Sequence, residues 1–160
     1  MAGIGNLFLG DDGFGPEVVR RLVAGDVSGL PDDVRVVDYG IRGMHLAYDL
    51  LDGCAALVLV DALPGAAEPG EVIVLEVGPD DLGQGEFDAH GMEPVAVLAS
   101  LGSLGGTLPP TYVVGCRPEN LDDGIGLSTV VADAVPVAVQ TVTDLVHRLV
   151  AAPATLTGRS

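Results

Sequence analysis

Positively charged residues are scarce in this chain. Arginine and lysine together number 7 of 160 residues, against 23 aspartates and glutamates, so the formal net charge is −16. Nucleic acids and anionic membranes are bound mainly through clustered lysine and arginine. The charge balance therefore excludes both as partners, and the simplest role of the acidic excess is solubility.

Sequence features of secretion, membrane anchorage and thiolate metal sites are also missing. No apolar run reaches the length of a membrane span, and no basic segment precedes an apolar stretch at the N-terminus. The two cysteines, Cys54 and Cys116, stand among apolar residues without a C-x-x-C partner. We therefore expect a cytoplasmic protein in which both cysteines are small buried residues and form no disulfide.

The overall composition is that of a folded α/β domain. Hydrophobic residues make up 48% of the chain and charged residues 19%, and short β-branched segments alternate with helix-like stretches. We predict one domain over residues 1–151, followed by a flexible tail over residues 152–160. Its fold class is a three-layer sandwich, in which a twisted, mostly parallel sheet of about five strands lies between helices.

Hydrophobic patterning places the elements of this domain. Strands are predicted over residues 34–39, 56–61, 72–76 and 112–115. The segment 56–61 is a continuous apolar run, which is typical of a central strand buried on both faces. Helices are predicted from Pro16, over 43–51, after Pro94 and over 128–150, where Pro136 should kink or restart the helix.

The first strand of this sheet is short of residues. A doubly wound sheet needs a first strand of roughly five residues before its first loop. Here only Met1 and Ala2 precede the glycine-rich segment that begins at Gly3. We therefore expect the first strand to be largely missing from the chain.

Two adjacent aspartates, Asp11 and Asp12, occupy this glycine-rich segment. Glycines allow positive φ or close approach of the backbone to another group. The segment does not suit a phosphate, because Phe8 breaks the G-x-G-x-x-G spacing, the chain has no lysine, and the carboxylates would repel it. A nucleotide-binding module is disfavoured, and a metal, or a cationic or amide substrate, is favoured.

Asp61 and His90 are further candidates. Asp61 ends the most apolar predicted strand, where it would face the same crevice as the first loop, and an aspartate is costly there without a partner. Its alternative role is to cap a turn or the next helix. His90 lies in a loop before the third predicted helix, whereas His45 and His147 are expected to pack or to face solvent.

These side chains leave several chemistries open. Carboxylates and imidazole suit zinc, nickel, iron or manganese, and three protein ligands leave positions for water or substrate. A proton shared between Asp11 and Asp12, as in aspartic proteases, is a lesser alternative, because adjacent residues on an extended loop tend to point apart. No G-x-S-x-G nucleophile motif is present.

The order of motifs resembles one family. The segments 3–6 and 10–15 closely resemble the N-terminal signature of the hydrogenase maturation proteases, which trim the C-terminus of the nickel–iron hydrogenase large subunit. Further similar segments are 38–44, 60–62, 88–90, 115–119 and 126–128. Each motif alone is moderately specific, and their order and spacing together are strongly so.

The resemblance implies a set of roles. It implies that Asp12, Asp61 and His90 bind nickel, that Asp12 or Asp61 is catalytic, and that Asp11, Gly40, Gly43 and Met44 bind substrate or shape the loop. The nickel would be presented by the precursor, with no organic cofactor. Water activation by the metal or by a carboxylate base both stay open, although the family is usually grouped with aspartic-type peptidases.

Two functions therefore compete. The first is an endopeptidase that removes the C-terminal extension of a nickel–iron hydrogenase large-subunit precursor after nickel insertion. The second is a metal-dependent maturation partner that docks on the same precursor without cutting it. The precursor is the expected partner in both cases.

Overall fold

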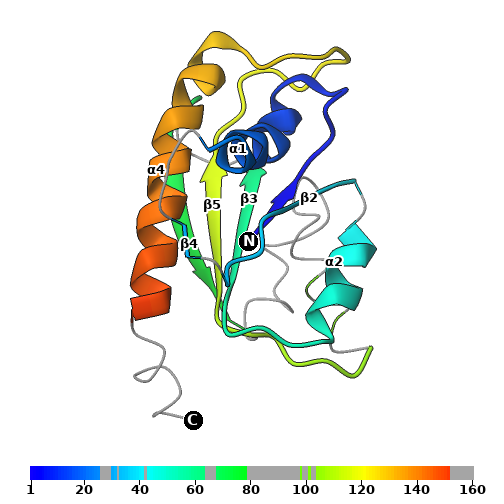
Figure 1. Cartoon of the computed structure of the whole chain (residues 1–160). Helices are drawn as coiled ribbons and strands as arrows, with labels where there is room; N and C mark the ends of the chain where they lie inside the picture. The colour runs from blue at the N-terminus through cyan, green and yellow to red at the C-terminus, as the bar shows by residue number, and fades with distance from the viewer. Residues whose placement is uncertain are drawn as a thin grey trace.

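The computed structural model describes residues 1–25, 30–31, 33–41, 43–63, 68–78, 98, 101 and 104–151. Within this part of the chain, a five-stranded sheet has the strand order β2-β1-β3-β5-β4. Helices α1 (Phe14–Val23) and α4 (Thr129–Ala151) cover one face, and α2 (Gly43–Leu50) covers the other (Figure 1). The predicted three-layer α/β sandwich is confirmed.

Four of the five strands run parallel. They are β1 (Ala2–Ile4), β2 (Val37–Gly40), β3 (Leu57–Ala62) and β5 (Thr111–Cys116). The remaining strand, β4 (Val72–Val77), pairs antiparallel with β5 at the edge of the sheet. The predicted strands all exist, and the apolar run at 57–62 is buried along its whole length, as a central strand should be.

The first strand is short but occupies a central position. β1 has 3 residues where β3 has 6, yet it pairs with both β2 and β3. Gly3 and Ile4, which the sequence assigned to a loop, belong to this strand. The expectation of a largely missing strand therefore needs correction, because the residues read as loop are the strand.

Two glycines allow α1 to lie directly on the sheet. A Cβ at Gly15 would lie 2.3 Å from the carbonyl oxygen of Val60 and 2.4 Å from that of Ile4. A Cβ at Gly3 would lie 2.6 Å from Val19 Cγ2. Since backbone carbonyls cannot move aside cheaply, glycine at position 15 fixes the start of α1 against β1 and β3.

The final helix is continuous through Pro136, so of the two predicted effects of the proline, a kink or a restart, the restart does not occur. α4 is a single element of 23 residues with Pro136 inside it. Its buried residues, including Val131, Val135, Val139 and Val142, pack on the sheet beside α1. The tertiary contacts of this face outweigh the local cost of the proline.

One helix meets the length and composition criteria for a membrane span. α4 has a window of mean hydropathy 1.4, which corrects the expectation that no apolar segment is long enough, and half of that window is buried in the domain. The core helix of a globular domain meets the same criteria. This observation is therefore weak evidence for a membrane.

Alternate residues of β3 divide the core into two clusters. Val58, Val60 and Ala62 face α1 and α4, whereas Leu57 and Leu59 face α2. Burying each such side chain contributes roughly 1.5–3 kcal/mol. Leu98 and Leu101, from the third predicted helix, are helical and join the α2 cluster. Residues 95–97, 99 and 100 of that prediction and the tail 152–160 lie outside the described residues.

The two cysteines have different environments. Cys116 is buried at the end of β5, as predicted, and burial raises the pKa of its thiol to about 11. Cys54 is exposed, which corrects its prediction, because it lies in the connection between α2 and β3 rather than in either element. Both are free thiols, as expected.

Candidate functional site

The carboxyl edge of the sheet brings together two of the predicted site residues. β1 and β3 are parallel neighbours, with Gly3 opposite Val60, so the loop after β1 and the end of β3 lie at one edge. The short 3-10 helix η1 (Gly10–Gly13) carries Asp12 and packs against β3. Asp61 is the last residue but one of β3.

Close backbone contacts hold the first loop over this edge. A Cβ at Gly5, whose φ is +149°, would lie 1.9 Å from the carbonyl oxygen of Asp12. The Gly5 N–H also donates to the Gly40 carbonyl at 3.0 Å. Glycine at position 5 therefore lets Asp12 approach the end of β1 and joins the loop to the end of β2.

The Asp12 carboxylate has one hydrogen-bond donor among the described residues. The backbone N–H of Asn6 donates to Asp12 Oδ2 at 2.8 Å. Burial raises the pKa of Asp12, and this single hydrogen bond only partly opposes the rise. A half-buried carboxylate with so few donors is stabilised by a cation, or by a substrate group that donates hydrogen bonds.

The Asp61 side chain is buried at the end of its strand. It is 4% exposed, and its Oδ1 accepts a hydrogen bond from the N–H of Ala62 at 2.8 Å. Strand alternation places it on the face of Leu57 and Leu59. This contact supports a turn-shaping role and leaves the predicted catalytic or metal-binding role of Asp61 untested.

Asp11 has a different environment from its neighbour. Its side chain is fully buried, and four hydrogen bonds reach its carboxylate. The N–H groups of Glu119 and Asn120 donate to Oδ2 at 2.8 and 2.9 Å, the Ser128 hydroxyl donates to Oδ2 at 2.8 Å, and the Ser128 N–H donates to Oδ1 at 2.6 Å.

These donors determine the charge state of Asp11. Burial alone would raise its pKa, but the hydrogen bonds from Ser128, Asn120 and Glu119 outweigh burial and lower the pKa. Asp11 also lies at the amino end of α4, where the helix dipole favours a negative charge. It is therefore an ionised residue that joins the first loop to the segment before α4, which fits the predicted loop-shaping role.

The carboxylates of Asp11 and Asp12 do not form a shared-proton pair. Asp11 is enclosed by donors from residues 119–128, whereas Asp12 accepts from Asn6. Their pKa values are displaced in opposite directions, because the number of donors differs. The aspartic-protease alternative at these two residues is therefore disfavoured by the geometry.

The remaining predicted residues are only partly described. Gly40 ends β2 at φ +56°, and its carbonyl accepts the Gly5 N–H, so it borders the loop. Gly43 and Met44 begin α2. His45 and His147 are exposed, as expected. His90 lies outside the described residues, and within the described part of the chain no three His, Cys, Asp or Glu side chains gather as a metal site.

Sequence reasoning missed two residues that organise the site. Asn6 supplies the donor to Asp12, and its own Oδ1 accepts the Phe8 N–H at 2.9 Å in a turn. Ser128 supplies two of the four donors to Asp11 from 117 residues away. The local turn at Asn6 could have been suspected from sequence, but the Ser128 contact depends on the tertiary fold.

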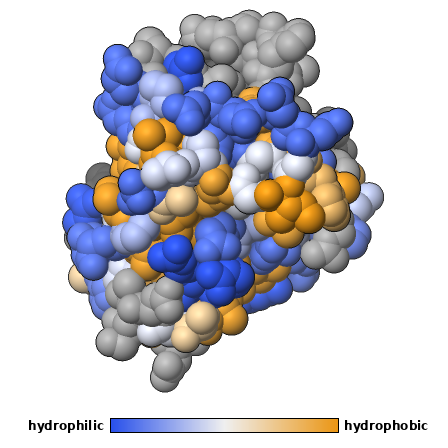
Figure 2. Space-filling model, turned by 90° about the horizontal axis from the view of Figure 1, so that it is seen from above, coloured by the Kyte–Doolittle hydropathy of each residue, from blue (hydrophilic) through white to orange (hydrophobic). Residues whose placement is uncertain are grey.

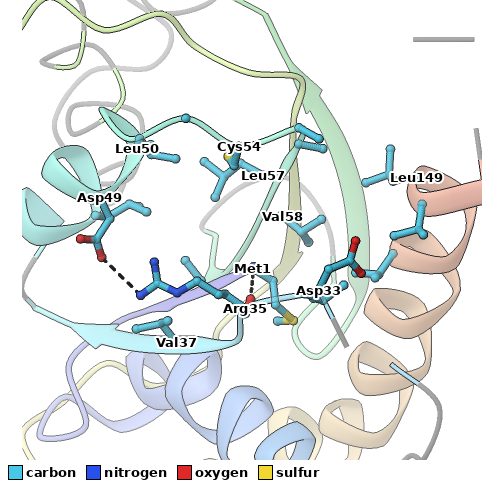
Figure 3. Close-up of a pocket in the computed structure, with 18 of the residues that line it drawn as sticks. Met1, Asp33, Arg35, Val37, Asp49, Leu50, Cys54, Leu57, Val58 and Leu149 are labelled. Atoms are coloured by element: carbon cyan, nitrogen blue, oxygen red, sulfur yellow. Dashed lines mark hydrogen bonds and ion pairs between the residues drawn. The ribbon is translucent and has the colours of Figure 1, made fainter. Parts of the chain in front are cut away.

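A cavity among the described residues lies at the opposite edge of the sheet. It has a volume of about 460 Å³ and is lined by residues at the starts of β1 and β3 and the end of α4. In Figure 3, the Met1 amino group donates to the Arg35 carbonyl, and the Arg35 guanidinium forms an ion pair with Asp49. This cavity is separate from the edge that carries Asp12 and Asp61.

The fold and the site define an α/β domain that carries acidic side chains at the carboxyl edge of its sheet. The family model for hydrogenase maturation protease (HycI) matches residues 16–145. A putative hydrogenase maturation protease of Methanocaldococcus jannaschii is 34% identical over 145 residues, covering 88% of this chain and 90% of that protein.

Solved structures agree with the family model. The Escherichia coli hydrogenase maturating endopeptidase HybD aligns with a TM-score of 0.76 at 27% identity, covering 92% of this chain and 90% of that chain. A hydrogenase 2 maturation peptidase of a Thaumarchaeota archaeon aligns with a TM-score of 0.68 at 31% identity, covering 91% and 96%. The chain belongs to the hydrogenase maturation protease family and is a maturation endopeptidase.

Proposed function

We propose that this endopeptidase removes the C-terminal extension of a nickel–iron hydrogenase large-subunit precursor after nickel insertion, and that it recognises the inserted nickel. The observation that carries the proposal is that Asp12, in the loop after β1, and Asp61, in β3, both lie at the carboxyl edge of adjacent parallel strands on the scaffold of this protease family. We place the reaction in the cytoplasm, as the sequence predicts.

The donor set fits a metal that arrives with the substrate. Asp12 and Asp61 offer carboxylate oxygens, and His90 would offer an imidazole nitrogen, without any thiolate. Such a set suits nickel as a ligand type but holds a free ion only modestly. These side chains would complete the coordination shell of nickel that is already bound in the precursor. This contact would bring the scissile peptide to the loop.

Hydrolysis then needs a water molecule and a proton acceptor. In this proposal Asp12 or Asp61 accepts the proton of the attacking water as general base, after which the proton passes to the leaving amine. Burial raises the pKa of Asp12, which makes its carboxylate a stronger base than an ordinary exposed one. Polarisation of the peptide carbonyl by the substrate's nickel is the alternative route.

The test is a processing assay with two forms of one precursor. The protein is incubated with nickel-loaded and nickel-free large-subunit precursor, and the precursor mass is measured. We expect a C-terminal peptide to be lost from the nickel-loaded form alone. An unchanged mass in both forms, with binding retained, would instead support the docking partner that does not cut.

Three variants test the residue roles. Asp12→Asn, Asp61→Asn and His90→Ala should each lower the processing rate by about 100-fold or more, since each removes a metal contact or a proton acceptor. The matched control is Asp133→Asn, an exposed aspartate of α4, which should process at the wild-type rate. Wild-type rates in all three site variants would show that other residues carry the reaction.

A further inference from the structure

Four large apolar side chains are exposed beside the first loop. Leu7, Phe8, Leu121 and Ile125 are 49%, 66%, 48% and 77% exposed. They belong to two segments far apart in sequence, the loop after β1 and the loop that precedes α4. We call these four residues the apolar rim. Exposed apolar residues gathered in one place mark an interaction surface more often than scattered ones do.

Backbone hydrogen bonds place the two segments side by side. The Gly124 N–H donates to the Phe8 carbonyl at 2.8 Å, and the Gly10 N–H donates to the Gly124 carbonyl at 2.9 Å. Leu9 and Gly124 form a parallel bridge. Phe8 therefore lies next to the chain that carries Ile125. Figure 2, which views the molecule from above Figure 1, shows hydrophobic patches among hydrophilic ones on this face.

The apolar rim is held in place before any partner arrives. The Asp11 carboxylate binds the N–H groups of Glu119 and Asn120 and both donors of Ser128, which fixes the second segment to the first. The Asp11 N–H also donates to the Asn120 carbonyl at 2.8 Å. A surface ordered in the free protein costs less conformational entropy on binding.

The exposed charged side chains within the two described segments of the apolar rim are acidic. Glu119, Asp122 and Asp123 are exposed on the second segment, and Asp12 follows the first. No arginine or lysine occurs within residues 5–13 or 118–128, and Arg117 directly precedes the second segment. The complementary partner presents apolar side chains flanked by lysine or arginine.

We infer that the apolar rim is the docking surface for the hydrogenase large-subunit precursor, and that it takes a basic, apolar segment of that protein. The inference rests on the proposed function, because it assigns the partner of the same site. The loop that carries Leu7 and Phe8 also carries Asp12, so a precursor whose scissile bond reaches Asp12 passes beside the rim. Binding energy gained there brings the peptide to the acidic edge.

The experiment separates docking from chemistry. The double variant Phe8→Ser/Ile125→Ser is compared with wild type in processing of nickel-loaded precursor, and KM and kcat are measured separately. We expect KM to rise about tenfold or more, equivalent to about 1.4 kcal/mol, with kcat within about twofold of wild type. Urea unfolding should be unchanged, since both side chains are exposed.

A matched control and a charge variant complete the test. Val137→Ser on α4, where the side chain is 54% exposed, should leave KM unchanged. Asp122→Asn/Asp123→Asn should weaken binding at low salt and reduce its dependence on salt concentration. A double variant with wild-type KM, or a Val137→Ser variant with an equal rise, would overturn the inference.

Failure of the inference and failure of the proposed function give different results. If wild type cuts the precursor and the double variant has the same KM, the docking surface is wrong and the function stands. If wild type leaves the precursor uncut, binding to immobilised nickel-loaded precursor is measured for the same proteins. Loss of binding in the double variant then supports the apolar rim, although the protease assignment to this substrate has failed.

Discussion

Replacing Asp11 by asparagine should destabilise the protein far more than the same change at Asp12. Asp11 Oδ2 accepts three hydrogen bonds and Oδ1 accepts one. An asparagine in the same place keeps a carbonyl oxygen for one side, but its NH₂ group then faces an N–H donor. At least one hydrogen bond to a buried charge is lost and one donor is left unpaired.

The magnitude follows from these contacts. A hydrogen bond to a charged group is worth about 1.5–3 kcal/mol, so Asp11→Asn should lower the free energy of unfolding by about 2 kcal/mol. Asp11→Ala leaves all four donors without this acceptor and should cost about 3–4 kcal/mol, less than the sum because Glu119 and Asn120 can reach water. For a chain of this size, 2 kcal/mol corresponds to a fall in Tm of roughly 4–8 °C.

The assay is urea unfolding followed by circular dichroism, with Asp12→Asn as control. Asp12 accepts one described hydrogen bond and its pKa is raised, so its neutral replacement should change stability by less than about 0.5 kcal/mol. Amide hydrogen exchange at Ser128 should quicken in Asp11→Asn alone. Equal unfolding midpoints for Asp11→Asn and wild type would refute the reasoning about Asp11.

Three further outcomes are expected. Gly15→Ala should unfold at markedly lower urea, because its Cβ would lie 2.3 Å from a backbone oxygen; an unchanged midpoint would contradict the close packing of α1. Tyr39→Phe should lower the free energy of unfolding by about 1 kcal/mol at neutral pH, because the Tyr39 hydroxyl donates a hydrogen bond to Asp49. Burial and this hydrogen bond raise the pKa of Tyr39 to about 12. The stabilisation by the Tyr39 hydroxyl is therefore complete below about pH 10 and is lost as the pH rises through about 12. The difference in urea midpoint between wild type and Tyr39→Phe should narrow over that range. A thiol reagent should modify exposed Cys54 in the folded protein and buried Cys116 only on unfolding; rapid modification of both would contradict the burial of Cys116.

The sequence predicted the sheet well where hydrophobic patterning is strong. The apolar run of β3 identified a central strand to within a residue, because a strand buried on both faces is apolar at nearly every position, and in β3 Asp61 is the one polar residue. The β4 segment was correctly predicted as a strand, but its edge position and antiparallel direction were not. The direction of a strand depends on the neighbour with which it pairs. The edge position was hidden because Val74 and Leu75 are apolar like core residues, although they are 44% and 37% exposed.

The first strand was misread for a physical reason. Glycine is depleted in strands, so Gly3 indicated a loop. In the structure Gly3 is part of β1. Glycine is needed at this strand position because a Cβ there would lie 2.6 Å from Val19 Cγ2 and 2.7 Å from the Gly15 carbonyl oxygen. Local propensity was therefore overridden by helix–sheet packing, which no local pattern reveals.

The acidic pair shows how far residue type can predict a role. Position in the fold separates two identical neighbours: Asp11 receives four donors from residues 108 to 117 positions away, whereas one described donor, the Asn6 N–H, reaches Asp12. The carboxylate of Asp11 is therefore fully hydrogen-bonded within the protein. These hydrogen bonds hold together the two segments that form the edge. The Asp12 carboxylate is left with few donors beside the buried end of β3. A carboxylate in that position gains most from a cation or a hydrogen-bond donor brought by another molecule, which is why we propose Asp12, and not Asp11, as the reactive member of the pair.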